Sequence, residues 1–141
     1  MYKIPFEVIG LQADGFHIIT QTTIYDKTFK IVIDTGASKT VLDKQTLLGS
    51  GLAEDNFQNT DILSTGLGTN TMESFMLSIP EMKLHDWSVK NFTVAVLDLS
   101  SINYAYTQIG IDPVIGVLGG DILKAYGVTL LLSRLRLQKQ I

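Results

Sequence analysis

Asp34, Thr35 and Gly36 are the residues whose types and spacing point most directly to chemistry. They follow the largely apolar run FKIVI at 29–33, so a carboxylate stands at the end of a predicted buried strand. Two carboxyl groups held close together share one proton, because both cannot ionise, and the ionised group can then activate a water molecule. That chemistry needs a carboxylate on a rigid strand end, a residue that fixes the loop by hydrogen bonding, and a Gly that lets two such loops approach. Asp34, Thr35 and Gly36 provide these three features. An ordinary turn after a buried strand is the alternative interpretation.

A second glycine motif lies in PVIGVLGGDIL, at 113–123. Its apolar run ends at Gly119, and Gly120 and Asp121 then open a short predicted helix. A strand that passes directly beside another backbone loop ends in Gly, because a Cβ would collide with that loop. The motif therefore predicts a close approach of two backbone segments at Gly119.

The elements that must position these residues are mostly strands. Alternation of apolar and polar residues predicts strands at 2–9, 16–25, 29–34, 73–84 and 88–99, a further strand pair within 127–138, and turns at 26–28 and 85–87. Helical patterns are confined to three short segments, at 44–48, 101–108 and 120–125, and Gly127 is the expected stop of the last. We expect one mostly β domain over residues 1–141, rolled into a closed barrel.

Composition excludes several classes of function. With 18% charged residues and a net charge of −3, the chain has no basic footprint, so we expect no nucleic-acid partner and no membrane partner. The N-terminus shows no signal-peptide pattern, which favours a cytoplasmic location. There is no Cys, and the two histidines, His17 and His85, are isolated, which is typical of surface or strand positions. We therefore expect no metal and no cofactor.

In order and content, the motifs IVIDTGASKTVLD and GVLGGDIL resemble those of the retropepsin-like aspartic proteases, from about residue 3 to residue 137. Ser38 stands where viral members often have Asp, so the chain looks more similar to cellular and bacterial relatives. The resemblance implies an all-β fold, a closed acid-protease barrel lobe with one or two short helices. It also implies an aspartic endopeptidase with catalytic residues Asp34, Thr35 and Gly36, supported by Ala37, Ser38 and Gly119.

The resemblance further implies that two copies of the chain are needed. Two-lobed pepsin-like relatives carry two Asp-Thr/Ser-Gly loops, whereas this sequence has one, since Asp14-Gly15 lacks the middle residue and Asp121 lies beyond the second motif. A symmetric homodimer would use the same loop twice and bring two Asp34 carboxylates together. The expected partners are a second copy and a peptide or protein substrate. A water nucleophile needs no covalent intermediate and no cofactor.

The family also has a flap, a β-hairpin that closes over the bound peptide. The candidate is residues 63–75, with Thr65, Gly66, Leu67 and Gly68 at its tip. A plain hairpin loop would have the same sequence pattern and is the alternative. Segments 43–63 and 98–113 exceed what a minimal retroviral lobe needs. They could form a dimer contact, a wall of the substrate cleft or a lid.

Two other functions stay open at this point. One is a catalytically silent module of the same fold that holds a peptide without cutting it. The other is a non-catalytic β-barrel that binds a small molecule, for which both motifs would have to be coincidental.

Overall fold

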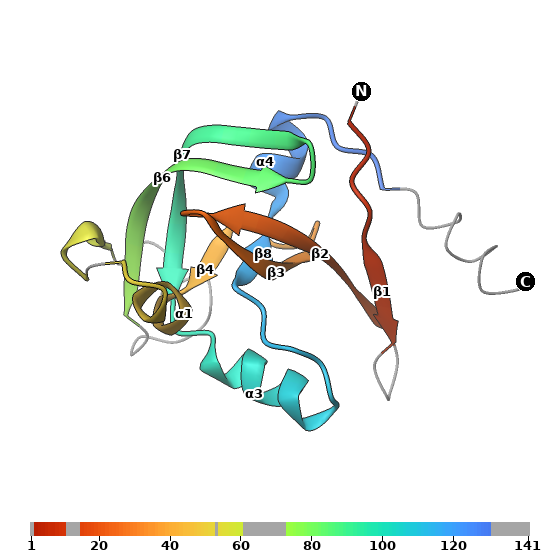
Figure 1. The fold of residues 1–141 in the computed structure, drawn as a ribbon, viewed down its shortest axis with the longest axis horizontal. Helices are drawn as coiled ribbons and strands as arrows, with labels where there is room; N and C mark the ends of the chain where they lie inside the picture. The colour runs from red at the N-terminus through yellow and green to blue at the C-terminus, as the bar shows by residue number, and fades with distance from the viewer. Residues whose placement is uncertain (1, 11–14, 53, 61–72, 131–141) are drawn as a thin grey trace, which may run out of the picture.

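The structure is a computed structural model that describes residues 2–10, 15–52, 54–60 and 73–130 (Figure 1). Its centre is a closed barrel with strand order β2-β3-β8-β4-β7-β6, in which β6 pairs back to β2. β1 lies at the edge of β2 and β5 at the edge of β6. The predicted all-β closed barrel is thus confirmed. The strands are β1 Glu7–Gly10, β2 Phe16–Ile24, β3 Lys27–Ile33, β4 Val41–Asp43, β5 Gln58–Thr60, β6 Ser74–Leu84, β7 Trp87–Leu97 and β8 Gly116–Leu118.

Two tight hairpins connect the long strands. Tyr25 and Asp26 join β2 to β3 with φ values of 50° and 62°, the left-handed conformation that two-residue hairpin turns require. The sequence predicted this turn slightly late, at 26–28, because Lys27 and Thr28 already pair with β2. The second hairpin turns at His85 and Asp86, and Trp87 belongs to β7 rather than to the predicted turn.

β8 is inserted between β3 and β4, two strands that lie far from it in the chain. It runs parallel to β3, with Ile31 opposite Gly116 and Ile33 opposite Leu118, and antiparallel to β4. A Cβ at Gly116 would lie 2.0 Å from the carbonyl oxygen of Val41, so only glycine fits there. This arrangement carries Asp34 and Gly119 to the same end of the barrel.

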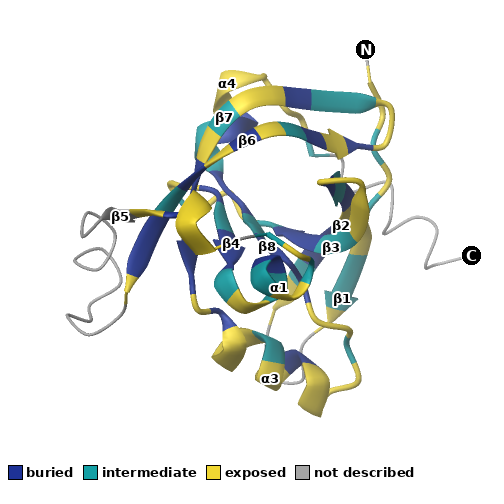
Figure 2. Ribbon diagram, turned by 60° about the vertical axis from the view of Figure 1, so that its left-hand side comes forward, coloured by how far each residue is buried: buried dark blue, intermediate teal, exposed yellow. Residues whose placement is uncertain are grey.

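Apolar side chains fill both sides of the sheet at β2 and β3. The barrel interior holds the larger cluster, which includes the fully buried Ile31, Leu42 and Met82. A smaller cluster lies outside the barrel, under helix α3 (Ser100–Gln108), and consists of Ile19, Val32, Tyr106 and Val114. Figure 2 shows α3 outside the barrel, below helix α1 (Lys44–Gly49). Alternate residues of β2 and β3 therefore face either the barrel or α3.

Short helices occur at all three predicted places: α1 Lys44–Gly49, α3 Ser100–Gln108 and α4 Gly120–Ala125, with a 3₁₀ turn, η1, at Glu54–Asn56. Gly127 has φ 62° just after α4, as expected of a helix stop. No described helix has the length and apolar character needed to cross a membrane.

Two strand predictions at the ends of the chain need correction. The first strand is shorter than the predicted 2–9, since pairing with β2 begins only at Glu7; Pro5, which has no amide hydrogen, instead accepts a hydrogen bond from the Thr20 hydroxyl (2.7 Å). Residues 128–130 form no strand, so the predicted C-terminal pair is wrong there. Its remainder lies outside the described residues. That residues 1–141 make up a single domain stays a prediction.

Candidate active site

Asp34 directly follows β3 and is fixed by its backbone while its side chain is exposed. Its amide donates a hydrogen bond to the Leu118 carbonyl (3.0 Å), which extends the pairing of β3 with β8 by one residue. The Gly36 amide donates to Asp34 Oδ1 (2.9 Å), and the Ala37 amide donates to the Asp34 carbonyl (3.2 Å). The carboxylate is therefore held in one orientation and remains open to a reactant.

Gly119 packs against the loop that follows Asp34, as its place in the sequence predicted. A Cβ there would lie 2.5 Å from the Lys39 carbonyl oxygen and 2.8 Å from that of Ala37, closer than real Cβ contacts allow. The Gly120 amide donates to the Ala37 carbonyl (2.6 Å). The two glycines thus let β8 and α4 support the loop from behind.

Thr40 and Asp121 form a second tie behind the same loop, which the sequence did not reveal. The fully buried Thr40 donates to Asp121 through its hydroxyl (2.7 Å) and through its amide (3.0 Å). The Thr40 hydroxyl oxygen also accepts from the Gly119 amide (3.0 Å). The only available signal was an Asp in the first turn of a helix, and that position is common to many helices.

The remaining predicted site residues are placed less tightly or not at all. Ala37 is half-buried and Ser38 is exposed, and the described contacts of the Asp34 carboxylate do not include the Ser38 hydroxyl. The flap residues Thr65, Gly66, Leu67 and Gly68 lie outside the described residues. Within the described ranges, His, Asp and Glu side chains form no group of three that would hold a metal ion.

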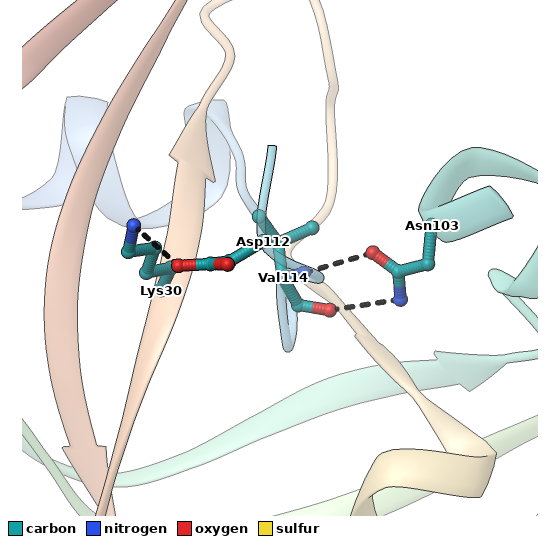
Figure 3. A network of polar contacts seen from close by, with 4 residues as sticks. All are labelled: Lys30, Asn103, Asp112 and Val114. Carbon is teal, nitrogen blue, oxygen red and sulfur yellow. Dashed lines mark hydrogen bonds and ion pairs between the residues drawn. The ribbon is translucent and has the colours of Figure 1, made fainter. Parts of the chain in front are cut away.

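Helix α3, part of the long segment 98–113, lies outside the barrel, where its Tyr106 packs with Val32 of β3. Asn103 fixes it there by donating to the Val114 carbonyl (3.1 Å) and accepting from the Val114 amide (2.8 Å), while Lys30 of β3 pairs with the neighbouring Asp112 at 3.1 Å (Figure 3). The helix begins after Asp98, whose pKa is lowered by hydrogen bonds from the Ser100 hydroxyl and amide. The three functions suggested for this segment, a dimer contact, a wall of the substrate cleft or a lid, stay predictions.

Tyr106 of α3 is buried, and its hydroxyl hydrogen-bonds to Nδ1 of the half-buried His17. Burial raises the pKa of the Tyr106 phenol, and the negative charge of Asp34 raises it further. The sequence treated His17 as an isolated histidine, because nothing in the pattern around residue 17 indicates a partner on a distant helix.

Comparisons with known proteins agree with this geometry. A family model described as aspartyl protease matches residues 20–122. Among solved structures, the fold is similar to a retropepsin-like aspartic protease from Rickettsia conorii (20% identity, 94% of this chain and 91% of that chain, TM-score 0.56). It is also similar to the retroviral protease-like domain of Ddi1 from Leishmania major (18% identity, 82% and 81%, TM-score 0.56).

A third similar structure is that of EIAV protease complexed with the inhibitor HBY-793, with 25% identity over 88% of this chain and 100% of that chain, and a TM-score of 0.57. A search of curated proteins finds no match. The family model and the folds together confirm the resemblance that the two sequence motifs suggested.

Proposed function

We propose, from the premise that this chain belongs to the aspartyl protease family, that it is an endopeptidase in which Asp34 supplies the reacting carboxylate. The observation that carries the proposal is the exposed Asp34 side chain on a loop held rigidly by Gly119, Gly120 and the Gly36 amide. This packing supports the loop from behind and leaves the carboxylate exposed.

The proposed mechanism uses two Asp34 side chains, one from each protomer of a homodimer. One ionised carboxylate takes a proton from the attacking water, and the other, protonated, donates its proton to the carbonyl oxygen of the scissile peptide. Thr35 and Gly36 hold the loops, with Ala37 and Ser38 beside them. One observation supports the dimer: the sequence has one Asp-Thr-Gly, so a second carboxylate of this kind would come from a second copy of the chain.

Cleavage of a denatured protein, followed at acidic and neutral pH, tests the chemistry. Asp34→Asn should lower the cleavage rate by about 10²-fold or more, since the amide cannot act as acid or base. Its carbonyl oxygen can still accept from the Gly36 amide, so the fold should survive. Asp26→Asn, in the exposed turn at the other end of β3, is the matched control and should cleave like the wild type.

Sedimentation across a concentration series tests the shared site. We expect a dimer near twice 15.5 kDa, with activity that follows the dimer fraction. A strict monomer at every concentration would contradict the two-carboxylate mechanism for the isolated chain. A dimer that binds a peptide and never cuts it would identify the silent binding module instead.

A further inference from the structure

We propose that Thr40 and Asp121 are positioning residues for the Asp34 carboxylate: together they fix the far end of the loop 34–40, so that the carboxylate is held in its reactive orientation. This inference rests on the proposed function, because it concerns the same carboxylate. It gives a role in the reaction to two side chains that lie behind the loop rather than at its exposed face.

One short segment, residues 118–121, holds the loop at three points. At the start of the loop the Asp34 amide donates a hydrogen bond to this segment (3.0 Å), and in the middle the Ala37 carbonyl accepts one (2.6 Å). At the end of the loop the Thr40 hydroxyl accepts a third (3.0 Å). The partners are, in the same order, the Leu118 carbonyl, the Gly120 amide and the Gly119 amide.

Asp121 secures the last of these three points. The fully buried Thr40 donates to it twice, from its hydroxyl to Oδ1 (2.7 Å) and from its amide to Oδ2 (3.0 Å). The Ile122 amide also donates to Oδ1 (2.8 Å), so the carboxylate is itself fixed. The Thr40 carbonyl accepts from the Ala95 amide of β7 (3.1 Å). Thr40 therefore joins the loop to α4 on one side and to the barrel on the other.

Gly36 is the residue through which this tie reaches Asp34. Its amide donates to Asp34 Oδ1 (2.9 Å), and it lies in the loop between the ends bound at Asp34 and at Thr40. A loop that is released at Thr40 lets the Gly36 amide move relative to the carboxylate that it orients. A displacement of about 1 Å in a reacting group can lower a rate by about 10²-fold, even when the mutation lies away from the chemistry.

Substitutions at Thr40 separate its hydroxyl from its shape. Thr40→Val removes the hydroxyl and keeps the branched side chain, whereas Thr40→Ser keeps the hydroxyl. Thr40→Val should lower kcat about 10- to 100-fold and change KM by less than about twofold, because misplacement of Asp34 affects the chemical step rather than binding. Thr40→Ser should retain kcat to within about threefold. Equal losses of kcat in the two variants, or a change in KM alone, would overturn the proposal.

Thr22→Val is the matched control for Thr40→Val. Thr22 is also buried, and its hydroxyl donates to the Lys83 carbonyl (2.9 Å), toward the other end of the β2–β3 pair from Asp34. Its loss should lower stability without lowering kcat, measured at a temperature where every variant is folded. A loss of kcat in Thr22→Val equal to that in Thr40→Val would assign the effect to stability and overturn the proposal.

Asp121→Asn tests the other partner of the tie. The amide has one acceptor oxygen, so in either orientation its NH2 group faces a backbone N–H of one partner. The fall in kcat should match that of Thr40→Val, and the double variant should lose little more than either single one, because both changes break the same tie. The matched control is Asp43→Asn, since Asp43 also accepts three hydrogen bonds, two from Thr46 and one from the Leu99 amide. Additive losses, or an equal loss of kcat in Asp43→Asn, would overturn the proposal.

The NMR resonance of the Gly36 amide proton gives a readout that needs no activity and separates this proposal from the proposed function. Thr40→Val and Asp121→Asn should shift it toward the position of a free amide, because its contact with Asp34 weakens, while Thr40→Ser and Thr22→Val should leave it in place. An unmoved Gly36 resonance in Thr40→Val would overturn the inference even if the protein is a protease. A wild-type protein that cuts no substrate, with the Gly36 shift present in Thr40→Val, would instead refute the proposed function and leave the tie to Asp34 supported.

Discussion

At the scale of single residues, the site depends on the missing Cβ of Gly119 as much as on the polar groups around Asp34. Because Gly119 has no Cβ, the Lys39 and Ala37 carbonyl oxygens lie only 2.5 Å and 2.8 Å from the position that a Cβ would occupy, which is closer than real Cβ contacts allow. This requirement was predictable, because the glycine ends an apolar run that must pass another loop. The role of Thr40 was not predictable, since its hydroxyl and its amide together make three hydrogen bonds to Gly119 and Asp121, which only the folded chain brings to it.

Gly119→Ala should destabilise the protein by about 1–3 kcal/mol, because the methyl group must displace backbone atoms that have no room to move. Cleavage should fall more than stability alone explains, since the displaced segment carries Asp34. Thermal unfolding and initial rates at a temperature where the variant is folded would measure the two effects.

Gly49→Ala is the matched control for that change. Gly49 is the last residue of α1, no atom lies within 4 Å of a Cβ built on it, and its φ is not positive. Alanine there should leave stability equal or raise it by a few tenths of a kcal/mol, up to about 0.5. Equal destabilisation by the two substitutions would contradict the close packing at Gly119.

At the scale of elements, hairpins were the easiest features to predict and α3 the hardest to place. Alternating apolar residues identified β2, β3, β6 and β7, because one face of each is buried in the barrel. The extent of α3 was also predicted nearly to the residue, yet its packing was not. The contacts that dock it, through Asn103 and Tyr106, join residues remote in sequence and leave no periodic signal.

The β2–β3 turn offers an element-level prediction. Asp26 has φ 62°, a conformation in which glycine avoids the Cβ penalty. Asp26→Gly should raise the free energy of unfolding by about 0.5 kcal/mol, the balance between relieved strain and a more flexible unfolded chain. Chemical denaturation would measure it.

Asp86→Gly, in the β6–β7 turn, provides the comparison. Asp86 does not have a positive φ, so glycine relieves no strain there and should lower stability by about 0.5–1 kcal/mol. If the two substitutions change the free energy of unfolding in the same direction, the difference in backbone conformation between Asp26 and Asp86 does not determine their effects.

At the scale of the whole molecule, alkaline pH should weaken the fold through two tyrosines. Burial raises the pKa of Tyr25 and Tyr106 above the ordinary value of 10.0. Below pH 10 these phenols are protonated in both the folded and the unfolded state, and stability is unaffected. Above pH 10 the unfolded chain ionises first, so the free energy of unfolding falls until the folded phenols ionise as well.

Denaturant unfolding between pH 8 and pH 11 checks this expectation. Tyr106→Phe should reduce the loss of stability above pH 10, and Tyr25→Phe should reduce it by a separate, additive amount because the two residues are on different elements. An alkaline dependence in Tyr106→Phe as steep as that of the wild type would show that the Tyr106 phenol does not contribute.

The insertion of β8 between β3 and β4 has a consequence for how the protein is made. The strand that completes the Asp34 loop is synthesised long after the strands on either side of it, and such distant pairing forms late in folding. A nascent chain that still lacks residues 116–121 has Asp34 but neither the Leu118 carbonyl nor the glycines that hold its loop. We therefore expect the proposed protease to become active only after this late segment has been synthesised and has paired with β3 and β4.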